Sequence, residues 1–198
     1  LTQNKYAGIS AGQERDDNGL KMKFCWCPRG IFMMGSPPTE ANRQKNEDQV
    51  EVTLTKGFWM GKFEVTQSEW QRIMGTTVED QIKARSGGGL SGIGPQHPMY
   101  FVGHDEATEF CRQLTEREHR SGRLPEDWEL RLPTEAEWEY ACRAGTTTAS
   151  AFGDNLINTQ ANVWRGNLND VEKNPGPGKT KEVGSYKPNA WGLCDTHG

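Results

Sequence analysis

Three segments of this sequence carry helix signals, whereas the chain after Gly145 shows little periodicity of any kind. Thr66 and Thr134 each stand three residues before a glutamate, which is the pattern of a capping box at the first turn of a helix. Glycines at positions 75 and 145 mark the corresponding helix ends. Between them, a stretch from His104 onward places apolar side chains at helical spacing and stops by a glycine at 122. Short helices in a largely unpatterned chain predict an α+β fold with much irregular structure.

Two further stretches show the alternation of apolar and polar residues that is typical of strands. Residues 22–26 alternate, and an apolar run at 31–34 follows a Pro-Arg-Gly turn. This pattern predicts a hairpin or two short strands. Residues 50–54 alternate strictly, and 58–63 resume the pattern after Lys-Gly, which predicts a second strand pair.

Length and charge exclude several classes of protein. The 198 residues suit one domain with a sizeable core, and we expect a polar lead-in over residues 1–20 and a single domain over 21–198. The net charge of −4 argues against nucleic acid as a partner. No apolar run approaches the roughly 18–20 residues that cross a bilayer, so no membrane span is expected. No signal-peptide layout opens the chain, which leaves the localisation open and favours the cytoplasm over export.

The five cysteines are an odd number at irregular spacings, which does not fit a disulfide scaffold. Cys25 and Cys27 stand two apart and could hold a soft metal such as Cu(I), because thiolates favour it. In a strand, however, such residues share one face, and buried cysteines commonly pack as small apolar groups. Packing is the favoured interpretation. The four histidines lack metal-ligand spacing on a helix, so the residues alone declare no active site.

The segment from Arg131 to Gly145, RLPTEAEWEYACRAG, closely resembles the signature of the formylglycine-generating enzyme family, also called the sulfatase-modifying factor family. Further pieces resemble the family in the same order, at residues 30–36, 63–67, 97–102, 183–185 and 188–198. The resemblance implies a compact variant of the C-type-lectin-like fold. It also implies that residues 21–198 are the N-terminal two-thirds of such a domain, truncated at the C-terminus.

The resemblance implies an oxidoreductase that uses copper and O₂ to convert a cysteine in a sulfatase Cys-x-Pro-x-Arg motif to formylglycine. A sulfatase polypeptide is then the expected partner. In the family, two cysteines hold Cu(I) in a segment beyond the equivalent of Gly198. We therefore expect no catalytic residue among these 198 and no activity from them in isolation.

Two other functions remain open on the resemblance. The family fold also occurs in non-catalytic modules that present loops to a ligand or a protein, and fold alone does not fix function. It further occurs in iron-dependent sulfoxide synthases, which carry an additional N-terminal helical domain with a histidine iron site. Nothing in residues 1–20 supplies such a site, so this alternative ranks last.

The resemblance also implies structural calcium. Asn162 and Val163 match positions that bind calcium in some members through a side-chain oxygen and a backbone carbonyl, with Asp170 as a weak further match. Asp195 and Gly198 match a second calcium site. Oxygen ligands of this kind suit Ca²⁺. The alternative for Asn162 is a turn in which the side chain hydrogen-bonds the local backbone.

Cys111 and Cys142 match positions that form disulfides in some members, with cysteines of the segment that is missing here. The alternative is that both lie buried on the apolar faces of their helices. The two interpretations are compatible.

Overall fold

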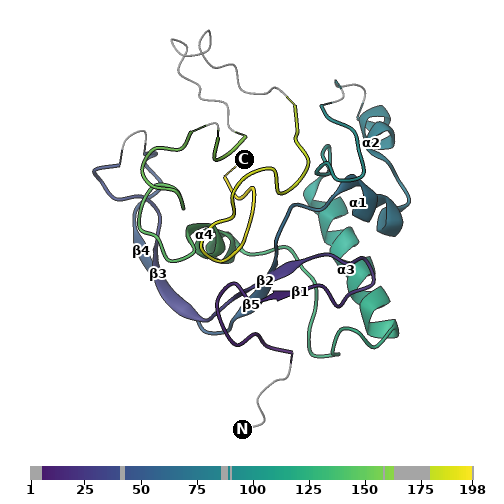
Figure 1. Ribbon diagram of the computed structural model, residues 1–198, viewed down its shortest axis with the longest axis horizontal. Coiled ribbons are helices and arrows are strands. Elements are labelled where there is room, and N and C mark those ends of the chain that lie inside the picture. The colour runs from purple at the N-terminus through teal and green to yellow at the C-terminus, as the bar shows by residue number, and fades with distance from the viewer. Residues whose placement is uncertain are drawn as a thin grey trace.

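The computed structural model describes residues 6–40, 43–85, 89, 91–157, 159–162 and 179–197. The predicted α+β class is confirmed: short antiparallel strands and helices alternate with long irregular segments (Figure 1). The elements are β1 (Glu14–Arg15), β2 (Phe24–Cys27), β3 (Gly30–Met34), β4 (Val50–Leu54), β5 (Phe58–Gly61), α1 (Gln67–Met74), α2 (Val78–Ala84), α3 (His104–Arg120) and α4 (Glu135–Arg143). No helix of the described residues has the length and apolar character needed to cross a membrane.

The strands form two separate antiparallel sheets. β2 lies between β1 and β5 and pairs Cys25 with Met60, while β3 pairs only with β4. Of the two alternatives for residues 22–34, two short strands are therefore correct and the hairpin is wrong. Both strands of the second predicted pair are confirmed, but their pairing with each other is wrong, because β4 and β5 belong to different sheets. The β3–β4 ribbon is thus inserted between two strands that pair with each other. How residues 1–20 divide from the rest stays a prediction, although β1 belongs to the first sheet.

The helices begin where the capping boxes predict. The hydroxyl of Thr66 accepts the N–H of Glu69 (3.2 Å), and the Glu69 carboxylate accepts the N–H of Thr66 (2.8 Å). Gly75 ends α1 in the left-handed region, at φ 72°. At the end of α4 the sequence predicts the left-handed conformation at Gly145, but it begins one residue earlier, at Ala144. Sequence reasoning missed α2, whose capping box pairs a threonine with an aspartate (Thr77 and Asp80).

Two apolar clusters hold the helices against the strands. In the first, Trp70 of α1 stacks on Phe110 of α3 with the ring centroids 5.5 Å apart. In the second, Ala141 of α4 packs with the buried cysteines of β2 and with Leu193 near the C-terminus. In Figure 1, α1, α2 and α3 gather on one side of the strands of the first sheet and α4 lies on the other.

Glu137, at the start of α4, gives a pH-dependent prediction. Its carboxylate accepts two hydrogen bonds from Arg131 (2.6 and 2.8 Å) and one from the Thr134 N–H (2.8 Å), and the Arg131 bonds are the main cause of its lowered pKa. A carboxyl whose pKa falls on folding stabilises the protein above its unfolded pKa, and this stabilisation is lost as the pH falls through the folded pKa. Glu137→Gln should therefore lower the free energy of unfolding by about 1 kcal/mol at neutral pH, because the pair is partly solvated.

The measurement is denaturant unfolding of the wild type and of Glu137→Gln across acidic and neutral pH. The difference between their free energies of unfolding should shrink in acid, where Glu137 is protonated. Glu135→Gln is the matched control, because Glu135 is exposed and has no hydrogen-bond partner among the described side chains. A loss for Glu137→Gln that is independent of pH would contradict the prediction.

Candidate functional site

Asp195 lies in a loop whose conformation is held by hydrogen bonds with the buried side chain of Asn189. The side-chain oxygen of Asn189 accepts the N–H groups of Trp191 (2.9 Å) and Leu193 (3.1 Å), and its amide donates to the carbonyl of Ala141 (2.8 Å). The backbone N–H of Cys194 then bonds the carbonyl that follows β5, at residue 62 (2.9 Å). The loop is therefore held between α4 and the end of β5, with Asp195 at φ 57°.

The carboxylate of Asp195 has one engaged and one unengaged oxygen. Oδ2 accepts the N–H of Gly184 (2.5 Å), whereas Oδ1 is buried without a hydrogen-bond partner among the described residues. Burial raises the pKa of Asp195. A buried oxygen without a donor is unusual in proteins and is consistent with a site that takes a cation.

Glu64 is a neighbouring acid that sequence reasoning did not select. Partial burial of its carboxyl, followed by the charge of Asp195, raises the pKa of Glu64 to about 7, although the residue as a whole is exposed. No periodicity or spacing brings residue 64 near residue 195. The backbone hydrogen bond between the N–H of Cys194 and the carbonyl of Lys62 joins these two parts of the chain.

Asn162 has the second unengaged oxygen. Its amide nitrogen donates to the carbonyl of Lys179 (3.1 Å), and its Oδ1 is buried without a partner among the described residues. The other calcium positions, Val163, Asp170 and Gly198, lie outside the described residues. The oxygens of Asn162 and Asp195 fit the donor chemistry of calcium, and the ligand sets stay a prediction.

Cys111 and Cys142 are free thiols in different surroundings. Cys111 lines a mostly apolar hollow of about 240 Å³ between α3 and the chain entering α1, together with Trp70 and Glu64. Cys142 is buried in α4, where its thiol donates to the carbonyl of Thr196 (3.4 Å). Whether either pairs with a further cysteine stays a prediction.

The thiol of Cys142 also touches an imidazole. Both ring nitrogens of His197 lie 3.6 Å from its sulfur, and Nε2 accepts the N–H of Ala151 (3.0 Å). Burial raises the pKa of Cys142 and lowers that of His197. Both shifts favour the neutral thiol and neutral imidazole, so this contact lacks the ion pair of an activated nucleophile.

Copper does not fit the cysteines of β2. Cys25 and Cys27 are fully buried, and desolvation raises the pKa of Cys25 to about 11 and that of Cys27 further. Cu(I) is held by thiolates, which such burial disfavours. Both side chains pack in the second apolar cluster, in keeping with the favoured interpretation. Across the described ranges, no group of three or more His, Cys, Asp and Glu side chains could hold a metal ion.

Comparison with known proteins covers nearly the whole chain. Residues 12–198 match the sequence model of the sulfatase-modifying factor enzyme 1-like domain. The formylglycine-generating enzyme of Streptomyces coelicolor is 36% identical over 109 residues, which are 52% of this chain and 30% of that enzyme. The chaperone protein LppX of Paenibacillus barcinonensis is 27% identical over 185 residues, which are 74% of this chain and 61% of LppX.

Among solved structures, PvdO from Pseudomonas aeruginosa has a TM-score of 0.68 at 24% identity, with 96% of this chain and 72% of PvdO covered. At this identity the likeness establishes the fold alone. The chain spans about a third of the length of the Streptomyces coelicolor enzyme and less than two thirds of LppX. The match over residues 12–198 nevertheless settles the family: this chain belongs to the sulfatase-modifying factor enzyme 1-like family.

Proposed function

We propose that the full-length protein is a formylglycine-generating oxidase, which converts a cysteine in a sulfatase Cys-x-Pro-x-Arg motif to formylglycine. The observation that carries the proposal is the 36% identity to the Streptomyces coelicolor enzyme over 109 residues, in a chain that matches the family from residue 12 onward. The acidic net charge and the free cysteines are compatible with this role.

The part of the chain described here would serve as the scaffold of that oxidase. Because the buried thiols of Cys25 and Cys27 do not fit copper, we derive no step through the metal, and we expect the copper ligands in another part of the full-length protein. What these residues would do is position loops: Asn189 orders the loop of Asp195 against α4, and the hollow at Cys111 offers an apolar surface beside Glu64.

The first test is to read the natural gene beyond the codon for Gly198. The proposal predicts two cysteines a few residues apart, and replacing either with serine should abolish the activity. A family domain that continues without such a pair would contradict the oxidase. It would favour the second candidate, a binding module without catalysis, to which the 27% identity to a chaperone protein lends support.

We also propose that Asn162 and Asp195 each contribute an oxygen to structural calcium. The support is that Oδ1 of each side chain is buried without a donor among the described residues, which disfavours the metal-free protein. Calcium should therefore raise the thermal midpoint of the full-length protein. At a calcium concentration of about 100 times Kd the gain in stability is about 2.7 kcal/mol.

Thermal unfolding with calcium, with magnesium and with a chelator measures this gain. Asp195→Ala should remove a large part of the calcium effect, whereas Asp127→Ala should keep it. Asp127 is the matched control, because it is an exposed aspartate with no side-chain partner among the described residues. An equal midpoint with calcium and with chelator would refute the calcium sites.

A further inference from the structure

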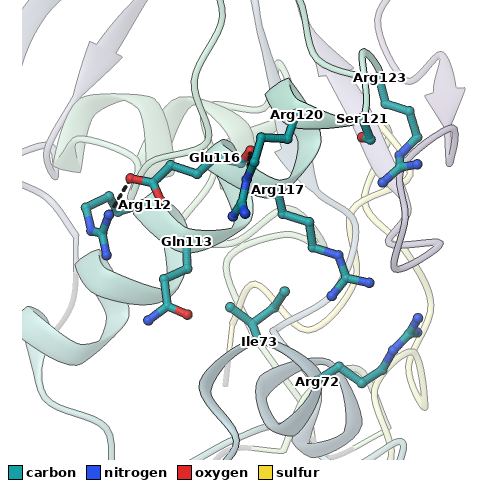
Figure 2. A pocket seen from close by; sticks show the side chains of 9 residues that line it. All are labelled: Arg72, Ile73, Arg112, Gln113, Glu116, Arg117, Arg120, Ser121 and Arg123. Atoms are coloured by element: carbon teal, nitrogen blue, oxygen red, sulfur yellow. Dashed lines mark hydrogen bonds and ion pairs between the residues drawn. The ribbon is translucent and has the colours of Figure 1, made fainter.

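Arginine side chains from two helices line one open groove of about 600 Å³. Figure 2 shows Arg117 and Arg120 extending from α3 and Arg72 extending from α1, with Ile73 below Arg117 and beside Arg72. Arg112 and Arg123 lie at the margins of the same groove. The groove is thus lined by five of the 12 arginines of the chain and by no lysine of the described residues, in a protein whose net charge is −4.

The two marginal arginines are already paired with carboxylates. Arg112 donates to both oxygens of Glu109 (2.6 and 2.7 Å) and also bonds Glu116. Arg123 donates to both oxygens of Glu118 (3.2 and 2.7 Å), whose side chain is almost wholly buried. These forked contacts leave the marginal guanidinium groups largely neutralised.

The three inner arginines have no carboxylate partner among the described residues. Arg72 donates only to the carbonyl of Gly19 (3.3 Å), and Arg120 donates only to the carbonyl of Glu116 (3.2 Å). The guanidinium of Arg117 forms no hydrogen bond or ion pair with the described residues. Glu116 also lines the groove, but its carboxylate is bonded to Arg112. The three inner positive charges therefore face the groove without a carboxylate partner of their own among the described residues, which makes it attractive to anions.

The helix dipole explains why each of the three inner arginines lies near a helix C-terminus, but it does not explain why all three line the same groove. Arg72 lies in the last turn of α1, and Arg117 and Arg120 lie in the last turns of α3, where cations are favourable. Lysine would give the same stabilisation as arginine at these positions, and the stabilisation does not require the side chains to line a common groove. Packing of α1 against α3 brings the two sets together.

We propose that this groove docks an acidic segment of a protein partner, in which aspartate or glutamate side chains flank an aliphatic one. The guanidinium fork matches the two oxygens of a carboxylate, as the pairs of Arg112 and Arg123 with glutamate demonstrate in the same groove. The side chain of Ile73, which lines the same groove, gives the aliphatic residue an apolar contact beside the charges.

Nucleic acid is the less suitable occupant. Single strands are bound by basic tracks with aromatic side chains on which bases stack, and none of the described residues that line this groove is aromatic. The overall negative charge would also repel a long polyanion outside the groove. A short carboxylate-bearing segment meets the positive charge without that repulsion.

The test is binding of a fluorescent acidic peptide, with glutamates around one leucine, to the full-length protein, followed by anisotropy. Arg117→Gln together with Arg120→Gln should weaken binding about tenfold at low ionic strength, as expected for the loss of two exposed ion pairs. Arg72→Gln should weaken it less, and added salt should weaken it in the wild type. Thermal unfolding should show all variants folded, because none of the three arginines holds a carboxylate.

The matched control is Arg29→Gln together with Lys56→Gln, which removes the same charge from two exposed residues outside the groove. Its binding should stay within about twofold of the wild type, in line with the small effect of distant surface charges. An analogue peptide with glutamine for glutamate should not bind. Absence of saturable binding to the wild type, equal weakening by both double variants, or tighter binding of an oligonucleotide of equal charge would overturn the proposal.

Discussion

Trp70→Ala is expected to lower the free energy of unfolding by about 3–5 kcal/mol, the range for truncating a large buried aromatic side chain. Trp70 is 3% exposed, and its ring stacks on Phe110 at an interplanar angle of 2°. Its indole N–H donates to the hydroxyl of Thr76 (3.0 Å). The substitution removes the aromatic stack between α1 and α3 and one of the two donors to that hydroxyl, which keeps the side-chain amide of Gln81 (3.3 Å).

Denaturant unfolding of the full-length protein measures the loss, and the chain offers a matched control. Trp138 lies on α4 and is 45% exposed, so Trp138→Ala should cost less than about 1 kcal/mol. Equal losses from the two variants would show that Trp70 is not part of a packed core. The arginine-lined groove is formed by the same two helices, α1 and α3. Trp70→Ala should therefore also weaken binding of the acidic peptide.

Asn189→Ala is expected to lower the free energy of unfolding by about 2–4 kcal/mol. Asn189 is 6% exposed, and its side chain makes hydrogen bonds both to its own loop and to the carbonyls of Ala141 and Cys142 in α4. Truncation leaves the N–H groups of Trp191 and Leu193 without acceptors, and each buried group without a partner costs about 1–3 kcal/mol.

The same substitution should reduce the stabilisation by calcium, because it loosens the loop that carries Asp195. Asn155 provides the control, since it is exposed and has no side-chain hydrogen bond among the described residues. Asn155→Ala should leave both the unfolding midpoint and the calcium effect near those of the wild type. A calcium effect that survives in Asn189→Ala would argue that this loop is not the calcium site.

The helices of this fold are predictable because their determinants are local. The capping boxes at Thr66 and Thr134 specify the starts of α1 and α4 within four residues of sequence. The strand partners are not predictable in this way, because β2 pairs across the whole β3–β4 ribbon to reach β5. Alternation specifies which side chains share a face but not which strand lies alongside.

The candidate sites show the same division. Family resemblance points to Asn162 and Asp195, but only the folded chain reveals that each has a buried oxygen to which no described residue donates. The raised pKa of Glu64 has no sequence signal, since it arises from tertiary burial and from a residue 131 positions later. The arginines of α3 look in sequence like an ordinary charged helix end, and their convergence with Arg72 requires the packing of two helices.

Conversion of a peptide by the full-length natural protein tests the proposed function most directly. Copper-loaded protein is incubated in air with a Cys-x-Pro-x-Arg peptide, and the products are captured with an aminooxy reagent and identified by mass spectrometry. We predict an aldehyde in place of the thiol, with none from a matched peptide carrying serine for cysteine and none from protein stripped of copper. Recovery of the cysteine peptide unchanged, from protein shown to be folded and loaded with copper, would contradict the oxidase.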